Sequence, residues 1–126
     1  MSHRPSWDVL AVVAAGGSLG AAARYGVGLA LPHDAGGFPW ATLGVNVLGC
    51  LAIGVLARRA PTHRLVWPFV GTGVLGGFTT FSTYAVDAWT LADAGRPLAA
   101  GAYVAGTLAA AVAAVWVGLR PHRSHA

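Results

Sequence analysis

Long apolar stretches separated by short polar breaks divide the chain into four segments. Each stretch has close to the length of about 20 residues that an apolar helix needs to cross the hydrocarbon of a bilayer. The stretches lie at about residues 7–31, 40–57, 65–91 and 97–119. The breaks contain Pro, Gly and charged residues, as connections between helices do. The pattern predicts an all-α integral membrane protein, with residues 1–126 forming a single four-span membrane domain.

Tryptophan placement supports these limits. Three tryptophans open spans and two lie near the ends of theirs: Trp7, Trp40, Trp67, Trp89 and Trp116. This distribution is typical of the aromatic belts at the two membrane–water interfaces. The alternative for the first stretch is a cleaved signal peptide over residues 1–23. It is disfavoured because the apolar pattern continues past Arg24 and three more spans follow.

The composition agrees with a membrane protein. The chain is 56% hydrophobic and only 10% charged, whereas about a quarter of the residues in a soluble domain are charged. Its net charge of +4 comes from arginines at segment ends that form no stripe, which argues against nucleic acid as a partner. Cys50 is the only cysteine and the five histidines lack ligand spacing, so neither an intramolecular disulfide nor a side-chain metal site is predicted.

The distribution of arginine predicts an orientation. With four spans, both tails and the 58–64 loop share one side of the membrane. Six arginines belong to that side: Arg4, Arg58, Arg59, Arg64, Arg120 and Arg123. The opposite side has Arg96, together with Arg24 if that side chain reaches the interface. Because positively charged loops stay in the cytoplasm, both termini are predicted to be cytoplasmic.

The third stretch contains a segment that is poor helix material. Residues 76–84 read GGFTTFSTY, with two glycines, four hydroxyl side chains and three aromatic rings. Glycine lowers helix propensity, and Ser and Thr hydroxyls compete for backbone hydrogen bonds, so a helix break is predicted. Irregular backbone at membrane depth must be buried or line a cavity, where its carbonyls suit a cation and its N–H groups suit an anion. The alternative is a kink used only for packing.

Polar residues in the other spans are candidate sites because they are costly in a membrane. Arg24 follows Gly16 and Gly20 at four-residue spacing, a small-residue face that favours close helix packing. Arg24 requires a buried partner or a watery cavity, unless it extends to the interface. Asn46 is either an interhelical hydrogen-bonding residue or a donor to a permeating anion.

The fourth span has a row of side chains on one helical face. Tyr103, Thr107 and Ala111 follow each other at intervals of four residues, and the first two are polar. Two acidic residues, Asp87 and Asp93, lie near the end of the third span. Both are interpreted as interfacial residues, Asp93 more firmly than Asp87.

These motifs resemble the fluoride channel family, Fluc, also called CrcB. The resemblance covers all four spans and rests on GGSLGAAARY in the first, TLGVNVLGCLAIG in the second and GVLGGFTTFSTYAVD in the third. It implies an antiparallel dual-topology dimer in the cell membrane. Each dimer would have two pores for passive fluoride export and a structural Na⁺ at its interface, without an organic cofactor.

The resemblance also implies roles for individual residues. The backbone carbonyls of Gly76 and Thr79 correspond to the sodium ligands, and Arg24 corresponds to the vestibule arginine. The pore residues by motif position are Asn46, Phe81 and Tyr84, with Tyr103 and Thr107 as the polar track and Ser82 and Thr83 as further hydroxyl candidates. Aromatic ring edges carry positive charge, so an anion can pass Phe81 and Tyr84 without being held too tightly.

The chain departs from the family pattern at three positions. The second pore aromatic is Tyr84 where Phe is usual, the third track position is Ala111 where a hydroxyl is frequent, and the acidic residue is Asp87 where Glu is usual. The arginine bias is also large for a dual-topology homodimer, so a heterodimer with an oppositely oriented paralogue stays an alternative.

Other function classes fit the sequence less well. A small four-span multidrug exporter needs a carboxylate within its first span, whereas the chain has no Glu and Asp8 lies at the start of that span. A membrane interaction protein without transport activity would not need a hydroxyl-rich break. An enzyme is not predicted, because no Ser/His, metal or paired-carboxylate set lies at membrane depth.

Overall fold

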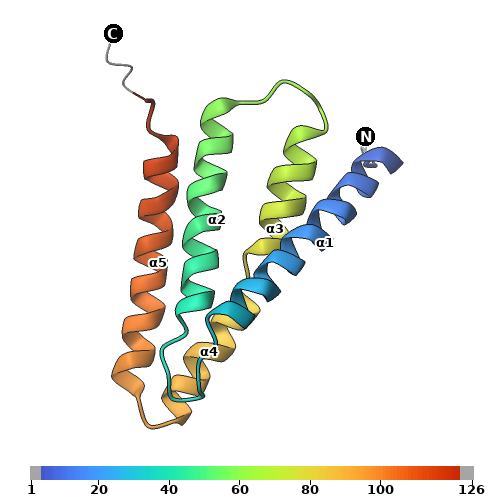
Figure 1. Ribbon diagram of the computed structural model, residues 1–126. Helices are drawn as coiled ribbons and strands as arrows, with labels where there is room; N and C mark the ends of the chain where they lie inside the picture. Colours follow the sequence, from blue (N-terminus) through green and yellow to red (C-terminus); the bar gives the residue numbers. More distant parts are fainter. Residues whose placement is uncertain (1–3, 123–126) are drawn as a thin grey trace.

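The computed structural model describes residues 4–122, and these residues form helices and connections with no strand (Figure 1). The elements in chain order are α1 (Trp7–Ala30), α2 (Trp40–Arg59), η1 (Trp67–Leu75), α3 (Gly76–Phe78), α4 (Ser82–Asp93) and α5 (Pro97–Leu119). Helices α1, α2 and α5, of 24, 20 and 23 residues, are long and apolar enough to cross a membrane. The protein is therefore an all-helical chain with at least three helices of membrane-spanning length among its described residues.

The segment from η1 to α4 is interrupted where residues 76–84 were expected to break a helix. Element α3 ends at Phe78, Thr79 has extended backbone with φ −82° and ψ 156°, and α4 begins at Ser82. The Thr79 hydroxyl donates to the carbonyl of Leu75 at 2.9 Å. Side-chain bonding to the backbone thus replaces part of the helical ladder at this point, as Thr residues favour.

Small residues allow the helices to approach closely. Helix α1 packs on η1 and α3, and α2 packs on α5. Gly16 and Gly20 are buried against η1, and a Cβ atom on Gly20 would overlap the Val74 carbonyl oxygen. The predicted packing role of these two glycines is confirmed. Gly54 has the same role between α2 and α5, where a Cβ atom would lie 2.5 Å from the Val115 carbonyl oxygen.

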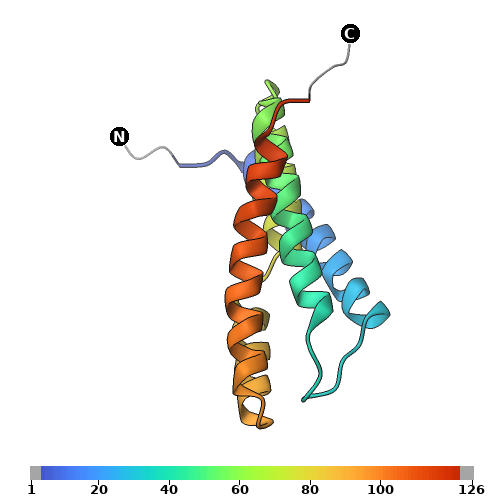
Figure 2. The ribbon, with the colours of Figure 1, turned by 90° about the vertical axis from the view of Figure 1, so that its left-hand side faces the viewer.

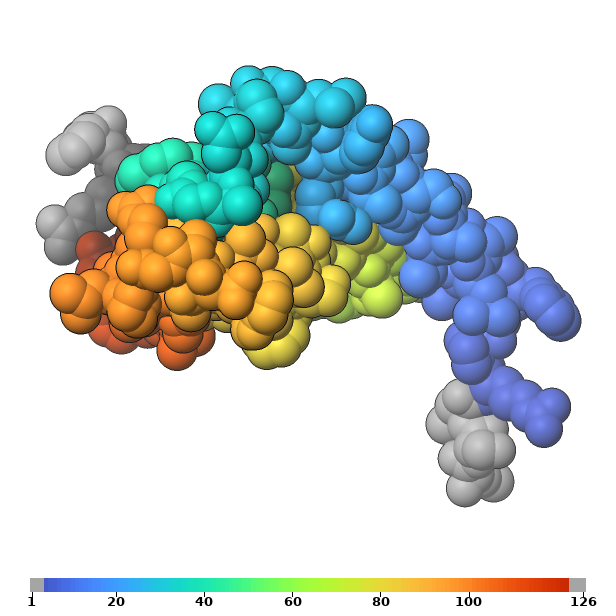
Figure 3. Space-filling model, turned by 90° about the horizontal axis from the view of Figure 1, so that it is seen from below, coloured from blue at the N-terminus to red at the C-terminus, as the bar shows by residue number. Residues whose placement is uncertain are grey.

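The two helix pairs are splayed relative to each other. Figure 2 shows α1 inclined to α2 and α5, with the 31–39 loop joining the separated ends. Figure 3, seen from below, shows α1 and this loop on one side of the surface and α4 and α5 on the other. The interruption lies where α1 and α2 both reach this segment: Arg24 of α1 donates to the Gly77 carbonyl in α3, and Asn46 of α2 donates to the Thr80 carbonyl.

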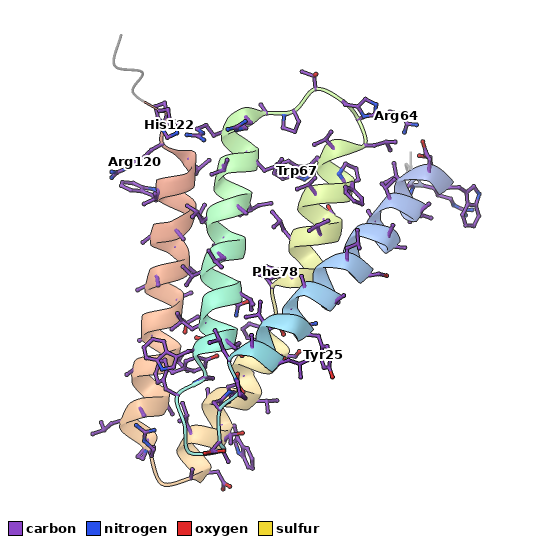
Figure 4. All side chains as sticks on the ribbon, in the orientation of Figure 1. Tyr25, Arg64, Trp67, Phe78, Arg120 and His122 are labelled. Carbon is purple, nitrogen blue, oxygen red and sulfur yellow. The ribbon has the colours of Figure 1, made fainter. Side chains whose placement is uncertain are left out.

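The two ends of the bundle differ in charge. The start of α1, the end of α5 and the 60–66 connection lie at one end, and the 31–39 and 94–96 connections lie at the other (Figure 1). Figure 4 labels Arg64, Arg120 and His122 at the end with the termini. Of the arginines used to predict orientation, Arg123 lies outside the described residues. The five tryptophans are exposed, with fractions from 43% at Trp67 to 87% at Trp7.

Candidate ion pathway

A cavity of about 290 Å³ lies beside the interruption between α3 and α4. Four of the predicted pore residues line it, although they come from α2, the interruption, α4 and α5: Asn46, Phe81, Tyr84 and Thr107. Ala111 completes the α5 side. The described lining contains no charged side chain, so an anion there would meet neutral groups only, including an amide, hydroxyls and aromatic rings.

Asn46 fixes the interrupted backbone in place. Its Nδ2 donates to the Thr80 carbonyl at 2.9 Å, and its Oδ1 accepts from the Thr80 N–H at 2.8 Å. Both sequence interpretations of Asn46 are compatible with this geometry. The side chain forms the interhelical bond, but an amide has two N–H donors and only one is used for Thr80. Because the Asn46 side chain also lines the cavity, its second N–H is the donor left for an anion there.

Two aromatic rings form one wall of the cavity. The centroids of Phe81 and Tyr84 are 5.9 Å apart and their planes are inclined by 52°. Phe81 is 79% exposed, whereas a Phe side chain is more often buried in a core. The Tyr84 hydroxyl donates to the Val104 carbonyl on α5 at 2.7 Å. The Tyr84 hydroxyl, which a Phe would lack, is therefore bonded to the backbone. The aromatic ring remains as the surface that an ion would contact.

Two buried hydroxyls on α5 have no hydrogen-bond partner. Tyr103 is completely buried and Thr107 is 4% exposed. Among the described residues, their oxygens are the only buried side-chain polar atoms without a partner. Tyr103 is fixed between Phe38 and Tyr84, at centroid distances of 5.4 and 5.3 Å. Because an unsatisfied buried hydroxyl costs about 1–3 kcal/mol, this row is suited to receive a ligand or water.

A second cavity, of about 320 Å³, contains the predicted vestibule arginine. Its lining includes Arg24, Thr42, Thr80 and Thr83. Arg24 is half-buried, and its Nε donates to the Gly77 carbonyl at 3.2 Å. Arg24 thus has a partner within the bundle, in α3, and the alternative that its side chain extends to the interface stays open. Thr80 lines both cavities.

The two further hydroxyl candidates lie apart from the cavity with the aromatic pair. Ser82 is exposed, and its Oγ is 3.4 Å from the Thr80 hydroxyl oxygen. Thr83 faces the Arg24 cavity, and its backbone N–H donates to the Thr80 hydroxyl at 3.2 Å. The structure therefore brings Thr83 together with Arg24 and places Ser82 at the surface of the interruption.

The carbonyls of Gly76 and Thr79 are suited to a cation. In a continuous α-helix they would accept from the N–H groups of Thr80 and Thr83, respectively. Those N–H groups donate instead to the Asn46 Oδ1 and to the Thr80 hydroxyl. Both carbonyls have thus lost their helical donors. Oxygen atoms freed in this way are the ligands that hard cations such as Na⁺ prefer at breaks in membrane helices.

Sequence reasoning missed three residues that contribute to the site. Thr80 links the two cavities, and Thr42 donates to Asp87 at 2.6 Å. Asp87 was treated as an interfacial residue, yet its side chain is only 11% exposed and is bonded within the bundle. One signal was available for Thr42, because it precedes Asn46 by four residues and so shares its helical face.

The family model described as CrcB-like protein, Camphor Resistance (CrcB), matches residues 11–119. A relative in Streptomyces coelicolor named "Fluoride-specific ion channel FluC 1" is 58% identical over 90% of this chain and 77% of its own length. "Fluoride-specific ion channel FluC 2" of Streptomyces avermitilis is 60% identical over 84% of this chain and 72% of its own length. The Rhodospirillum centenum relative "Fluoride-specific ion channel FluC" is 45% identical, with coverage of 88% and 92%.

The matched residues include the interruption, Asn46, the aromatic pair and the α5 hydroxyls. Three apolar helices of membrane-spanning length agree with a multi-pass protein of the cell membrane. From the extent of these matches, the chain belongs to the CrcB family.

Proposed function

We propose that this protein is a fluoride-selective ion channel for passive export, rather than an enzyme, as the names of its relatives indicate. The observation that carries the proposal is the cavity where Asn46, Phe81, Tyr84 and Thr107 meet. These residues come from four separate segments, and none of them is charged. A channel must bind an ion weakly enough to release it, which neutral groups achieve and a buried cation would prevent.

Permeation requires that the protein replace the water around fluoride. The spare N–H of Asn46 and the unpartnered hydroxyls of Tyr103 and Thr107 supply donors. The positive edges of Phe81 and Tyr84 supply weaker attraction. A small anion can approach several such groups together, whereas a larger halide is held off by its radius. This geometry favours fluoride over chloride.

The segment from η1 to α4 is proposed as a fourth, interrupted span. It runs from Trp67 to Asp93, with exposed tryptophans, Trp67 and Trp89, toward its two ends. An apolar segment of this extent is long enough to cross a bilayer. The irregular backbone at Thr79–Phe81 is bonded to α2 through Asn46 and lines a cavity, as membrane depth requires.

The functional unit is proposed to be an antiparallel dimer with two pores. Phe81 is 79% exposed although it lines the cavity, so a second chain placed over the interruption would bury it and close the open side of the pore. Either a second copy or an oppositely oriented paralogue could fill this role. Terminal reporter tags distinguish them: tags found only in the cytoplasm require a paralogue, and tags found on both sides of the membrane support a homodimer.

A structural Na⁺ is proposed where two interruptions would meet in the dimer. The carbonyls of Gly76 and Thr79 lack their helical donors and would hold it. Its positive charge would stabilise the unsatisfied backbone of both chains. Replacing Na⁺ by N-methyl-D-glucamine during purification should lower fluoride flux, and adding Na⁺ back should restore it. Equal flux without any small cation would refute the sodium site.

Anion efflux from liposomes tests the proposed function. Vesicles loaded with equal fluoride and chloride should release fluoride far faster when they contain the protein. Protein-free vesicles measure the leak. Equal release of both halides would refute a fluoride-selective channel, and release of neither would leave the chain as a membrane interaction protein.

A further inference from the structure

An acidic residue and a histidine lie together at the end of the molecule opposite the termini. The Asp87 carboxylate accepts from the Thr42 hydroxyl at 2.6 Å through one oxygen. Its other oxygen is 3.7 Å from the Nε2 of His33, in the connection between α1 and α2. The side chains of Asp87 and His33 are 11% and 31% exposed. The imidazole therefore lies on the outer side of a nearly buried carboxylate.

This carboxylate is bonded to a residue that lines one of the two cavities. Thr42, which fixes it, lines the cavity that contains Arg24. An anion in the Arg24 cavity is therefore near a lining residue, Thr42, that is bonded to a group carrying negative charge when ionised. Such a charge opposes anion entry unless a neighbouring cation compensates it.

His33 is the group best placed to compensate Asp87. Histidine is the side chain that changes charge between about pH 5 and 8. The surrounding elements carry other charged or titratable groups. The acidic ones are Asp34 in the same connection and Asp93 near the 94–96 turn, and the phenolic ones are Tyr84 and Tyr103. The basic ones are Arg96, which donates to the Gly36 carbonyl, and Arg24 in the cavity that Thr42 lines. Among the described residues, only His33 forms an ion pair with Asp87.

We propose that His33 is a proton-operated residue at the pore mouth, which controls anion entry by compensating the charge of Asp87. The inference rests on the proposed channel function. At acidic pH the imidazolium pairs with the carboxylate, and the mouth carries no net negative charge from this pair. At alkaline pH the imidazole is neutral and the carboxylate repels an entering anion. Fluoride flux should therefore rise as pH falls.

Fluoride efflux from proteoliposomes at pH 5.5 to 8 tests this inference, with protein-free vesicles measuring the leak of undissociated HF. Flux through the unaltered protein should be about fivefold greater at the acidic end, the ratio that corresponds to about 1 kcal/mol for one partly exposed charge pair. His33→Gln should hold flux at the alkaline level across the range. His33→Arg should hold it at the acidic level, because the guanidinium keeps its charge.

The matched control is His63→Gln, which alters a histidine in the 60–66 connection at the opposite end and should leave the pH profile unchanged. Asp87→Asn should abolish the pH dependence in the presence of His33. An unaltered pH profile in His33→Gln would overturn the inference while leaving the channel intact. Absence of fluoride flux at every pH in the unaltered protein would instead refute the channel proposal itself.

Discussion

Asn46→Asp is the sharpest perturbation of the proposed pore, because it changes one atom of a side chain whose bonds are known. The Thr80 N–H donates to the Asn46 Oδ1 at 2.8 Å, and an aspartate oxygen can accept that bond equally well. The Nδ2 bond to the Thr80 carbonyl, at 2.9 Å, is lost because a carboxylate has no donor. The substitution thus retains one of the two hydrogen bonds to Thr80 and places a negative charge in the cavity wall.

The charge dominates the expected loss of function. Two unit charges about 4 Å apart repel by about 4 kcal/mol at an effective dielectric constant of about 20. This corresponds to a decrease in fluoride entry of about a thousandfold. The lost hydrogen bond accounts for only about 1–3 kcal/mol of folding stability, some of which the retained bond offsets. Flux should therefore disappear while the assembled protein persists.

The assay is fluoride efflux from liposomes, with size-exclusion elution and thermal unfolding measured in the same detergent. Asn46→Leu serves as the matched uncharged variant, since it removes both bonds to Thr80 without adding charge. Asn46→Leu should lose more stability than Asn46→Asp, whereas Asn46→Asp should lose more flux. Fluoride flux in Asn46→Asp within tenfold of the unaltered protein would refute the placement of Asn46 beside the ion.

Three further variants, one of them with a matched control, test the packing and the two sides of the cavity. Gly77→Ala should lower the free energy of unfolding by about 1–3 kcal/mol, because its Cβ would overlap the Gly17 carbonyl. The control, Gly101→Ala on an open face of α5, should not destabilise the protein. Equal melting temperatures for the two variants would contradict this packing. Thr107→Val should slow fluoride efflux about five- to tenfold through loss of one hydrogen bond, and unchanged efflux would remove this hydroxyl from the path. Phe81→Ile should abolish efflux without altering unfolding of the chain, because the ring is 79% exposed. Retained efflux would remove this ring from the ion path.

Several parts of the structure could be predicted from sequence periodicity and residue chemistry. The long apolar stretches gave α1, α2 and α5 to within about two residues at each end. The four-residue spacing of Gly16 and Gly20 predicted close helix packing, and the structure places η1 against them. The glycines and hydroxyls of residues 76–84 indicated where helical structure stops, because both effects are local to the backbone.

Contacts between distant segments could not be predicted in the same way. Nothing in the sequence near Asn46 indicates that its amide bonds both backbone groups of Thr80. The partner of Arg24 is the carbonyl of Gly77, and any residue type could supply that group. The bond from Thr42 to Asp87 joins residues 45 positions apart. Such pairs depend on how α1 and α2 meet the interruption, which local periodicity does not determine.

The central physical claim is that the interruption allows fluoride to exchange water for ring edges and hydroxyls. Solid-state ¹⁹F NMR of the protein in lipid bilayers measures this most directly, with magnetisation transfer between bound fluoride and protein protons. A fluoride resonance distinct from free fluoride is expected, with transfer from the ring protons of Phe81 and the hydroxyl of Thr107, and it should be lost in Asn46→Asp. A spectrum that contains only free fluoride, at concentrations that support efflux, would contradict the account.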